Sequence, residues 1–145
     1  MYFAYGANMD VLAMADRCPR SKPVSVGRLA GSRFFISRDG YASVRREANA
    51  SVHGLLWALA WADIPALDRF EDLSSGLYRK ESRPVLRAGG GPIPAMIYVG
   101  RTGENGPPQP GYLEPIIAAA ETLGFAPTYI AELRSWMPPR GPLRR

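Results

Sequence analysis

Residues 24–44 read VSVGRLAGSRFFISRDGYASV, and this stretch decides the class of fold. Apolar and β-branched residues are frequent in 24–29 and 32–37, which predicts a strand in each segment. The RDG sequence at 38–40 is a strong turn signal and leads into a further strand at 41–44. This part of the chain is therefore predicted to be rich in β-structure.

The segments on either side extend this pattern. Residues 2–5 are apolar and predict a short buried strand, and Gly6-Ala7-Asn8 supplies a turn before a helix at about 9–17. Asn8 is the expected N-cap of that helix because its side chain can accept a hydrogen bond from a free backbone N–H. The apolar run at 52–60 predicts a central strand.

A helix is predicted over 63–70, where apolar residues recur at three-residue steps. Asp63 is its expected N-cap. Glu71 falls at the C-terminal end of this helix.

The second half of the chain predicts two more strands and two more helices. Strands at 78–86 and 93–99 form a hairpin, and the Gly- and Pro-rich residues 100–111 form an ordered loop. Helices follow at 112–123 and 127–136. The fold class is therefore α+β, a mostly antiparallel sheet that curls into a barrel with flanking helices.

Length and composition predict one domain over 1–137, with residues 138–145 as a flexible C-terminal tail. The single Cys18 excludes an internal disulfide. No apolar run is long enough to span a membrane, and no signal peptide precedes the first strand, so a cytoplasmic location is expected.

The net charge of +5 comes from 18 basic residues that are distributed along the whole chain. No nucleic-acid-binding module accompanies this charge, so we expect a small-molecule partner and neither nucleic acid nor membrane. The oligomeric state is not predicted.

Three motifs in order resemble the γ-glutamyl cyclotransferase-like family, which is also called AIG2-like. YFAYGANM at 2–9 is similar to its signature loop. LDRFE at 67–71, followed by Gly76-Leu77-Tyr78, is similar to the motif that carries its acidic residue. PPQPGYL at 107–113 is similar to its closing Pro-rich loop. The chain departs from the family at Ala7, where serine is usual.

The resemblance implies the fold of that family and the activity of a γ-glutamyl cyclotransferase, with Glu71 as the catalytic residue. In this reaction the α-amine of the substrate attacks its own γ-glutamyl carbonyl, so 5-oxoproline and a free amine form without a metal or cofactor. Tyr98 is a secondary candidate for the pocket. The substrate-binding residues that the resemblance implies are Tyr2, Phe3, Ala4, Tyr5, Gly6, Ala7, Asn8, Tyr78 and Tyr112.

The residues themselves fit this chemistry. One carboxylate can remove the proton from the attacking amine and return it to the departing amine. Glu71 follows the apolar Leu67 and Phe70, so partial burial and a raised pKa are expected. Without the resemblance, an ordinary surface glutamate at a helix end explains this residue. The turn after the first strand can bind an anion through free N–H groups.

Other functions remain open. One is removal of a γ-glutamyl protecting group from a larger biosynthetic intermediate, and another is a non-catalytic ligand-binding module of the same fold. Cys18 and His53 are the only candidates for a thiol nucleophile and its base, but packing explains both, and they are too few for a zinc site.

Overall fold

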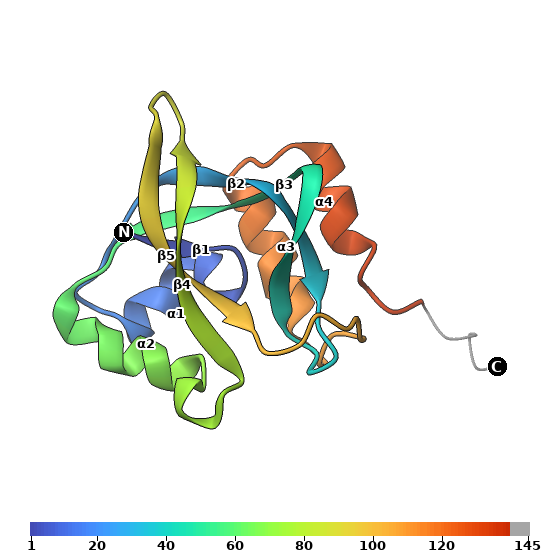
Figure 1. Ribbon diagram of the computed structural model, residues 1–145, viewed down its shortest axis with the longest axis horizontal. Helices are drawn as coiled ribbons and strands as arrows, with labels where there is room; N and C mark the ends of the chain where they lie inside the picture. The colour runs from blue at the N-terminus through green and yellow to red at the C-terminus, as the bar shows by residue number, and fades with distance from the viewer. Residues whose placement is uncertain (140–145) are drawn as a thin grey trace.

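The structure is a computed structural model that describes residues 1–139. Five strands form a closed barrel in the order β1-β3-β2-β4-β5 (Figure 1). Every pairing is antiparallel except that of β1 with β5, where Tyr2 is paired with Met96 in a parallel bridge. The predicted α+β class and the mostly antiparallel barrel are confirmed. The strands are β1 (Tyr2–Ala4), β2 (Lys22–Ile36), β3 (Ala42–Ala58), β4 (Tyr78–Arg87) and β5 (Pro92–Gly100).

The four short strands predicted between residues 24 and 60 are in fact two long ones. The predicted segments 24–29 and 32–37 belong to the single strand β2, which continues through a register shift between Ala30 and Ser32. The intervening Gly31 has φ +70°, so it forms part of an irregularity inside the strand rather than a turn that ends it. In the same way, the polar residues before the predicted strand at 52–60 are part of β3.

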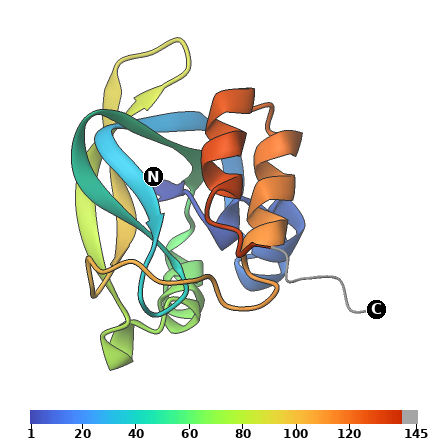
Figure 2. The same ribbon diagram turned by 90° about the vertical axis from the view of Figure 1, so that its right-hand side faces the viewer.

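Four α-helices and three 3-10 helices accompany the barrel in the described part of the chain. Helices α3 and α4 pack together along one side of the barrel (Figure 2). The buried face of α3 consists of Leu113, Ile116, Ile117 and Ala120, as its apolar spacing predicts. The helices are η1 (Ala7–Met9), α1 (Val11–Arg17), η2 (Trp61–Asp63), α2 (Ile64–Phe70), η3 (Leu73–Ser75), α3 (Leu113–Thr122) and α4 (Pro127–Arg134).

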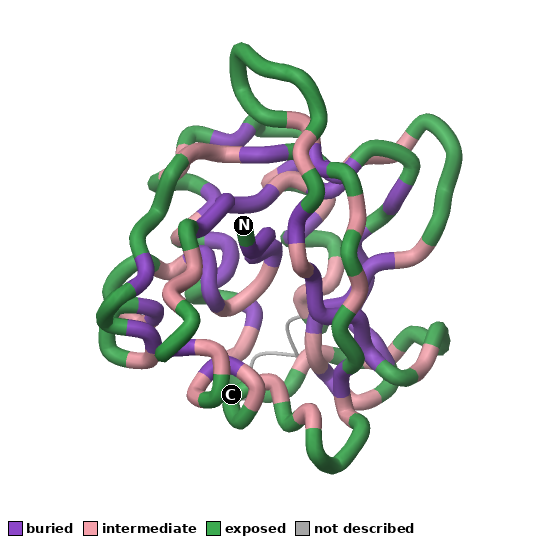
Figure 3. Tube along the Cα trace, turned by 60° about the vertical axis from the view of Figure 1, so that its left-hand side comes forward, coloured by how far each residue is buried: buried purple, intermediate pink, exposed green. Residues whose placement is uncertain are grey.

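The buried residues lie mainly along the strands and the inner segments, while the outer loops are exposed (Figure 3). Strand β1 runs very close to β3: a Cβ added to Gly54 would lie 2.4 Å from the carbonyl oxygen of Ala4. Only glycine at position 54 lets the first strand enter the barrel there. Because β1 leads directly into η1, this close approach also sets the position of the loop that follows.

The prediction of Asn8 as an N-cap is wrong. The chain first makes the 3-10 helix η1, and Asp10 caps α1 by accepting hydrogen bonds from the N–H groups of Leu12 and Ala13 at 3.1 and 3.2 Å. Asn8 is instead buried, with 2% of its surface exposed. Asn8 and Asp10 both have side chains that can cap a helix, and the local sequence alone did not show which of them does so.

Asp63 occupies the predicted N-cap position of α2, but its side chain makes no capping bond to that helix. Its buried carboxylate accepts hydrogen bonds from the backbone N–H of Arg20 at 3.0 Å and the hydroxyl of Ser21 at 2.8 Å. Ser21 in turn accepts a hydrogen bond from the N–H of Ala60. Asp63 therefore joins the start of α2 to the segment that follows α1.

We expect Asp63→Ala to lower the free energy of unfolding by about 2 kcal/mol, because two buried donors lose their acceptor. Urea denaturation monitored by circular dichroism measures this change. Asp16→Ala is the matched control, since Asp16 is an exposed acid on α1 and its removal should change stability by less than about 0.5 kcal/mol. Equal stability of the two variants would contradict the linking role of Asp63.

Within residues 1–139, no helix combines the length and the apolar character needed to cross a membrane. Of the predicted tail at 138–145, residues 140–145 lie outside the described residues.

Candidate active site

One cavity of about 440 Å³ lies at the point where η1, the end of α2 and strands from the barrel meet. Its wall comes from β1 and η1 on one side and from residues 69–72 on another. Further residues of the wall come from the start of β3, from the start of β4 and from the position before α3. Segments far apart in the sequence therefore share one cavity.

The cavity brings together all but one of the predicted site residues. The exception is Ala4, which is buried in β1 and does not line the cavity. The predicted residues that line the cavity are Tyr2, Phe3, Tyr5, Gly6, Ala7, Asn8, Glu71, Tyr78 and Tyr112.

Glu71 forms the C-cap of α2, and its backbone N–H donates to the carbonyl oxygen of Leu67 at 3.0 Å. Leu67 is fully buried, so it anchors the last turn of the helix against the core. Directly after Glu71 the chain turns away through Asp72, whose φ of 51° lies in the left-handed region. This geometry leaves the Glu71 side chain at the wall of the cavity.

Burial raises the pKa of Glu71 from 4.5 to about 7, and the positive charge of Arg17 partly opposes this rise. The carboxyl group can therefore hold or release a proton near neutral pH. The sequence predicted a raised pKa for Glu71, and this prediction is confirmed. The cause is the desolvation that its apolar neighbours suggested.

The loop after β1 forms another part of the cavity wall. A Cβ added to Gly6 would lie 3.3 Å from the hydroxyl oxygen of Tyr112, a tight contact that Tyr112 would have to relieve by a small shift. The next residues, Ala7 and Asn8, begin the 3-10 helix η1. The first N–H groups of such a turn have no acceptor within the helix, so they are suited to a carboxylate or an oxyanion.

Hydroxyl groups of three tyrosines are organised around this cavity. Tyr78 donates a hydrogen bond to the carbonyl oxygen of Ala42, and Tyr112 accepts one from the N–H of the same residue at 3.0 Å. Tyr5 donates to the carbonyl oxygen of Tyr98. Because the Tyr112 oxygen accepts from the backbone, its own proton is directed to other acceptors, including a bound ligand.

Burial raises the pKa of each of these phenols, as it does for Tyr2. The tyrosines are therefore neutral hydrogen-bonding groups at ordinary pH.

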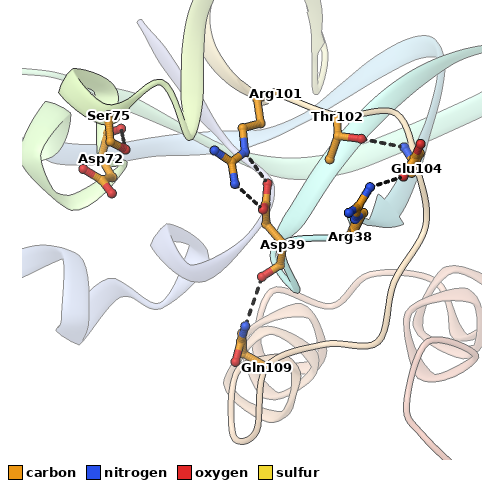
Figure 4. Close-up of polar contacts among 8 residues, drawn as sticks. All are labelled: Arg38, Asp39, Asp72, Ser75, Arg101, Thr102, Glu104 and Gln109. Atoms are coloured by element: carbon orange, nitrogen blue, oxygen red, sulfur yellow. Dashed lines mark hydrogen bonds and ion pairs between the residues drawn. The ribbon is translucent and has the colours of Figure 1, made fainter.

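The turn at 38–41 is attached to the loop at 100–111, as Figure 4 shows. Arg101 makes two hydrogen bonds to the carboxylate of Asp39, at 2.7 and 3.0 Å, and Gln109 donates to the carbonyl oxygen of Asp39 at 3.1 Å. The guanidinium of Arg101 lowers the pKa of Asp39. These contacts hold the predicted loop in an ordered form next to the cavity.

The attached turn and loop carry two aromatic residues of the cavity wall. Tyr41 and Tyr112 pack edge to face with ring centroids 5.1 Å apart. Tyr41 was not predicted as a site residue, although its place directly after a strong turn signal was visible in the sequence. The other lining residues not predicted are Ala42, Arg69, Phe70, Asp72 and Leu77, and Tyr98 was a secondary candidate.

Cys18 and His53 do not come together as a nucleophile and base. The thiol of Cys18 contacts the carbonyl oxygen of Asp63, whereas His53 packs against Phe125 and Tyr129 near α4. Neither residue lines the cavity. Among residues 1–139 no group of three potential metal-ligating side chains is found.

Comparisons with known proteins point in one direction. Residues 51–133 match the AIG2-like family. The chain is 26% identical to gamma-glutamylcyclotransferase of Mus musculus, over 95% of this chain and 79% of that protein. The corresponding protein of Homo sapiens is 25% identical over the same shares of the two chains.

Solved structures show the same fold. A gamma-glutamyl cyclotransferase superposes with a TM-score of 0.86 and 23% identity, covering 99% of this chain and 90% of that one. YkqA from Bacillus subtilis superposes with a TM-score of 0.75 and 26% identity, covering 94% of this chain and 53% of that one.

Proposed function

Because this chain belongs to the AIG2-like family, we propose that it is a γ-glutamyl cyclotransferase in which Glu71 is the general acid and base. The substrate is a γ-glutamyl amide, and the products are 5-oxoproline and a free amine or amino acid. The observation that carries the proposal is the Glu71 carboxyl group, with a pKa of about 7, in the same cavity as the Tyr5-Gly6-Ala7-Asn8 loop.

The reaction needs one cyclisation and, besides the loss of a second proton from the ring nitrogen, two proton transfers through Glu71. Glu71 in its carboxylate form accepts a proton from the α-ammonium group of the substrate, and the freed amine attacks the γ-carbonyl carbon. A C–N bond forms in a five-membered ring, and the carbonyl oxygen becomes an oxyanion. Glu71 then donates its proton to the departing nitrogen as the original C–N bond breaks, and the ring nitrogen releases its remaining extra proton to the freed amine or to water, which leaves a neutral lactam. A pKa near 7 suits both transfers.

The loop after β1 supplies hydrogen-bond donors for the negative charges of the substrate. Ala7 and Asn8 line the same cavity as Glu71, and their backbone N–H groups can bind the α-carboxylate or the oxyanion. Alanine at position 7 removes the hydroxyl that the family usually has there, but it keeps the backbone donor. The phenol groups of Tyr78 and Tyr112 complete a wall that is both apolar and hydrogen-bonding.

The proposal predicts release of 5-oxoproline from a panel of γ-glutamyl amino acids, γ-glutamyl amines and glutathione. The corresponding α-glutamyl peptides are the matched control, because their free amine cannot form the same five-membered ring by attack on the scissile carbonyl. Release from at least one γ-glutamyl compound and from no α-glutamyl compound is the expected result, measured by chromatography of the products.

The outcome also separates the alternatives. Release only from a γ-glutamyl group on a larger molecule supports the removal of a protecting group from a biosynthetic intermediate. Tight binding of 5-oxoproline with no turnover of any compound overturns the enzymatic proposal and supports a binding module.

A further inference from the structure

Arg17, the last residue of α1, lies between two walls of the cavity without lining it. Its Nη1 donates a hydrogen bond to the side-chain oxygen of Asn8, in the loop after β1. On the other side, its guanidinium carbon lies 3.4 Å from the centre of the Phe70 ring, the residue before Glu71. One side chain therefore contacts both the proposed anion-binding loop and the end of the helix that carries the proposed acid and base.

The contact with Asn8 determines how that amide is oriented. The Asn8 nitrogen donates to the hydroxyl of Tyr2 at 2.9 Å, and the Asn8 backbone oxygen accepts from the indole of Trp57 at 3.1 Å. With the amide nitrogen used by Tyr2, the amide oxygen must face a donor, and Arg17 is that donor. Asn8 is buried, so water does not readily replace this bond.

The contact with Phe70 is a stacking interaction between a planar cation and an aromatic ring. Phe70 is 42% exposed and lies in the last turn of α2, so the core alone does not hold this part of the helix. The guanidinium covers the ring and so restrains the residue that precedes Glu71. It also brings a positive charge close enough to lower the pKa of Glu71 against the effect of burial.

No other cation has that effect on Glu71 among the described residues. The phenols that face it are kept neutral by their raised pKa values. Asp68, one turn earlier on α2, is engaged by Lys80 and by the hydroxyl of Tyr98. The titratable and charged groups around Glu71, besides Arg17, are Tyr2, Tyr5, Tyr78, Tyr98 and Tyr112, with Asp68, Arg69 and Asp72 on its own segment.

We propose that Arg17 is a positioning residue that fixes the Asn8 amide and the end of α2, so that Asn8 and Glu71 face a shared substrate. The inference about substrate turnover rests on the proposed function, whereas the inference about Glu71 does not. Arg17 acts through Asn8 and Phe70 and does not itself touch the reacting atoms.

Three variants test this role: Arg17→Met, Arg17→Lys and the control Arg20→Met. Methionine keeps much of the length of the side chain but removes the charge and the donors. Lysine keeps the charge but lacks the planar group that stacks and donates from several directions. Arg20 is an exposed arginine three residues away whose removal changes the net charge equally.

The first measurement is the pH titration of the Glu71 carboxyl carbon by NMR in the free protein, which needs no turnover. Arg17→Met should raise the pKa of Glu71 by about half a unit or more, because the opposing charge is gone. Arg17→Lys and Arg20→Met should leave it close to the wild-type value. An unchanged titration in Arg17→Met overturns the electrostatic part of the proposal.

The second measurement is the pH profile of kcat/KM together with KM itself. Arg17→Met should move the acid limb to higher pH and raise KM by roughly tenfold, through the loss of a buried hydrogen bond to Asn8. Arg17→Lys should keep the acid limb at the wild-type pH but should still raise KM, since lysine lacks the planar group that stacks on Phe70 and donates several hydrogen bonds.

If Arg17 only stabilises the fold, the acid limb of the kcat/KM profile should stay at the same pH in both Arg17 variants. That result overturns the proposal. If the wild type releases no 5-oxoproline at all, the proposed function fails, while the NMR titration still decides the effect of Arg17 on Glu71.

Discussion

Glu71→Gln is expected to lower kcat for 5-oxoproline release by about 10²- to 10⁴-fold, the usual contribution of a positioned acid and base. Glutamine has nearly the same shape as glutamate but cannot accept or donate the proton that the cyclisation requires. The cavity itself should be retained, so binding of 5-oxoproline, measured by calorimetry, should change little. Steady-state kinetics on the substrates that the panel identifies measure the loss.

Two comparisons sharpen this experiment. Glu114→Gln, at an exposed position on α3, makes the same chemical change away from the cavity and should retain wild-type activity. In the wild type, kcat/KM should fall as the pH drops below about 7, because a protonated Glu71 cannot act as the base. A Glu71→Gln variant that keeps more than about a tenth of wild-type kcat would show that another group transfers the proton.

Glu71→Gln is also expected to make the protein more stable than the wild type at pH 8. The folded protein raises the pKa of Glu71 from 4.5 to about 7, so folding disfavours the charged form. The associated stability is fully present below about pH 4.5 and is lost as the pH rises through about 7. At 1.4 kcal/mol for each unit, the gain of the glutamine variant at pH 8 approaches about 3 kcal/mol.

Urea denaturation at pH 5 and pH 8 tests this linkage, because other ionisable groups contribute equally to both proteins. The difference between Glu71→Gln and the wild type should be small at pH 5 and large at pH 8. Glu114→Gln should show no comparable change between the two pH values. A constant difference for Glu71→Gln would mean that Glu71 is as well solvated in the folded protein as in the unfolded chain.

Such a gain in stability would be the expected consequence of a carboxyl group held in a desolvated place for chemistry. The proposed mechanism uses the charged form of Glu71, which burial in the folded protein disfavours. Arg17 reduces this cost, which is a further reason to expect that its removal shifts the properties of Glu71.

Several elements could be predicted from local sequence because their causes are local. The residues typical of strands and the RDG turn predicted a strand on each side of residues 38–40, and β2 and β3 lie there and pair with each other. The Gly-rich turn between β4 and β5 and the apolar face of α3 were predicted on similar grounds. In each case, the residues that determine the element lie within the element or next to it.

Errors arose where an element depends on a distant partner. Gly31 looked like the end of a strand, but pairing with β3 continues on both sides of it, so β2 continues too. Asp63 looked like a helix cap, but Arg20 and Ser21 occupy its carboxylate. Neither contact is visible in a short window of sequence.

The sequence by itself determined the barrel class, the position of most strands and helices, and the motifs that place this chain in its family. Only the tertiary structure decided that Ala4 does not line the cavity that Asn8 and Glu71 share, and that Arg17 contacts both Asn8 and Phe70. The physical reason is that backbone propensity and hydrophobic periodicity act over a few residues. Burial, charge–charge interaction and the pKa of Glu71 depend instead on distances between segments far apart in the chain.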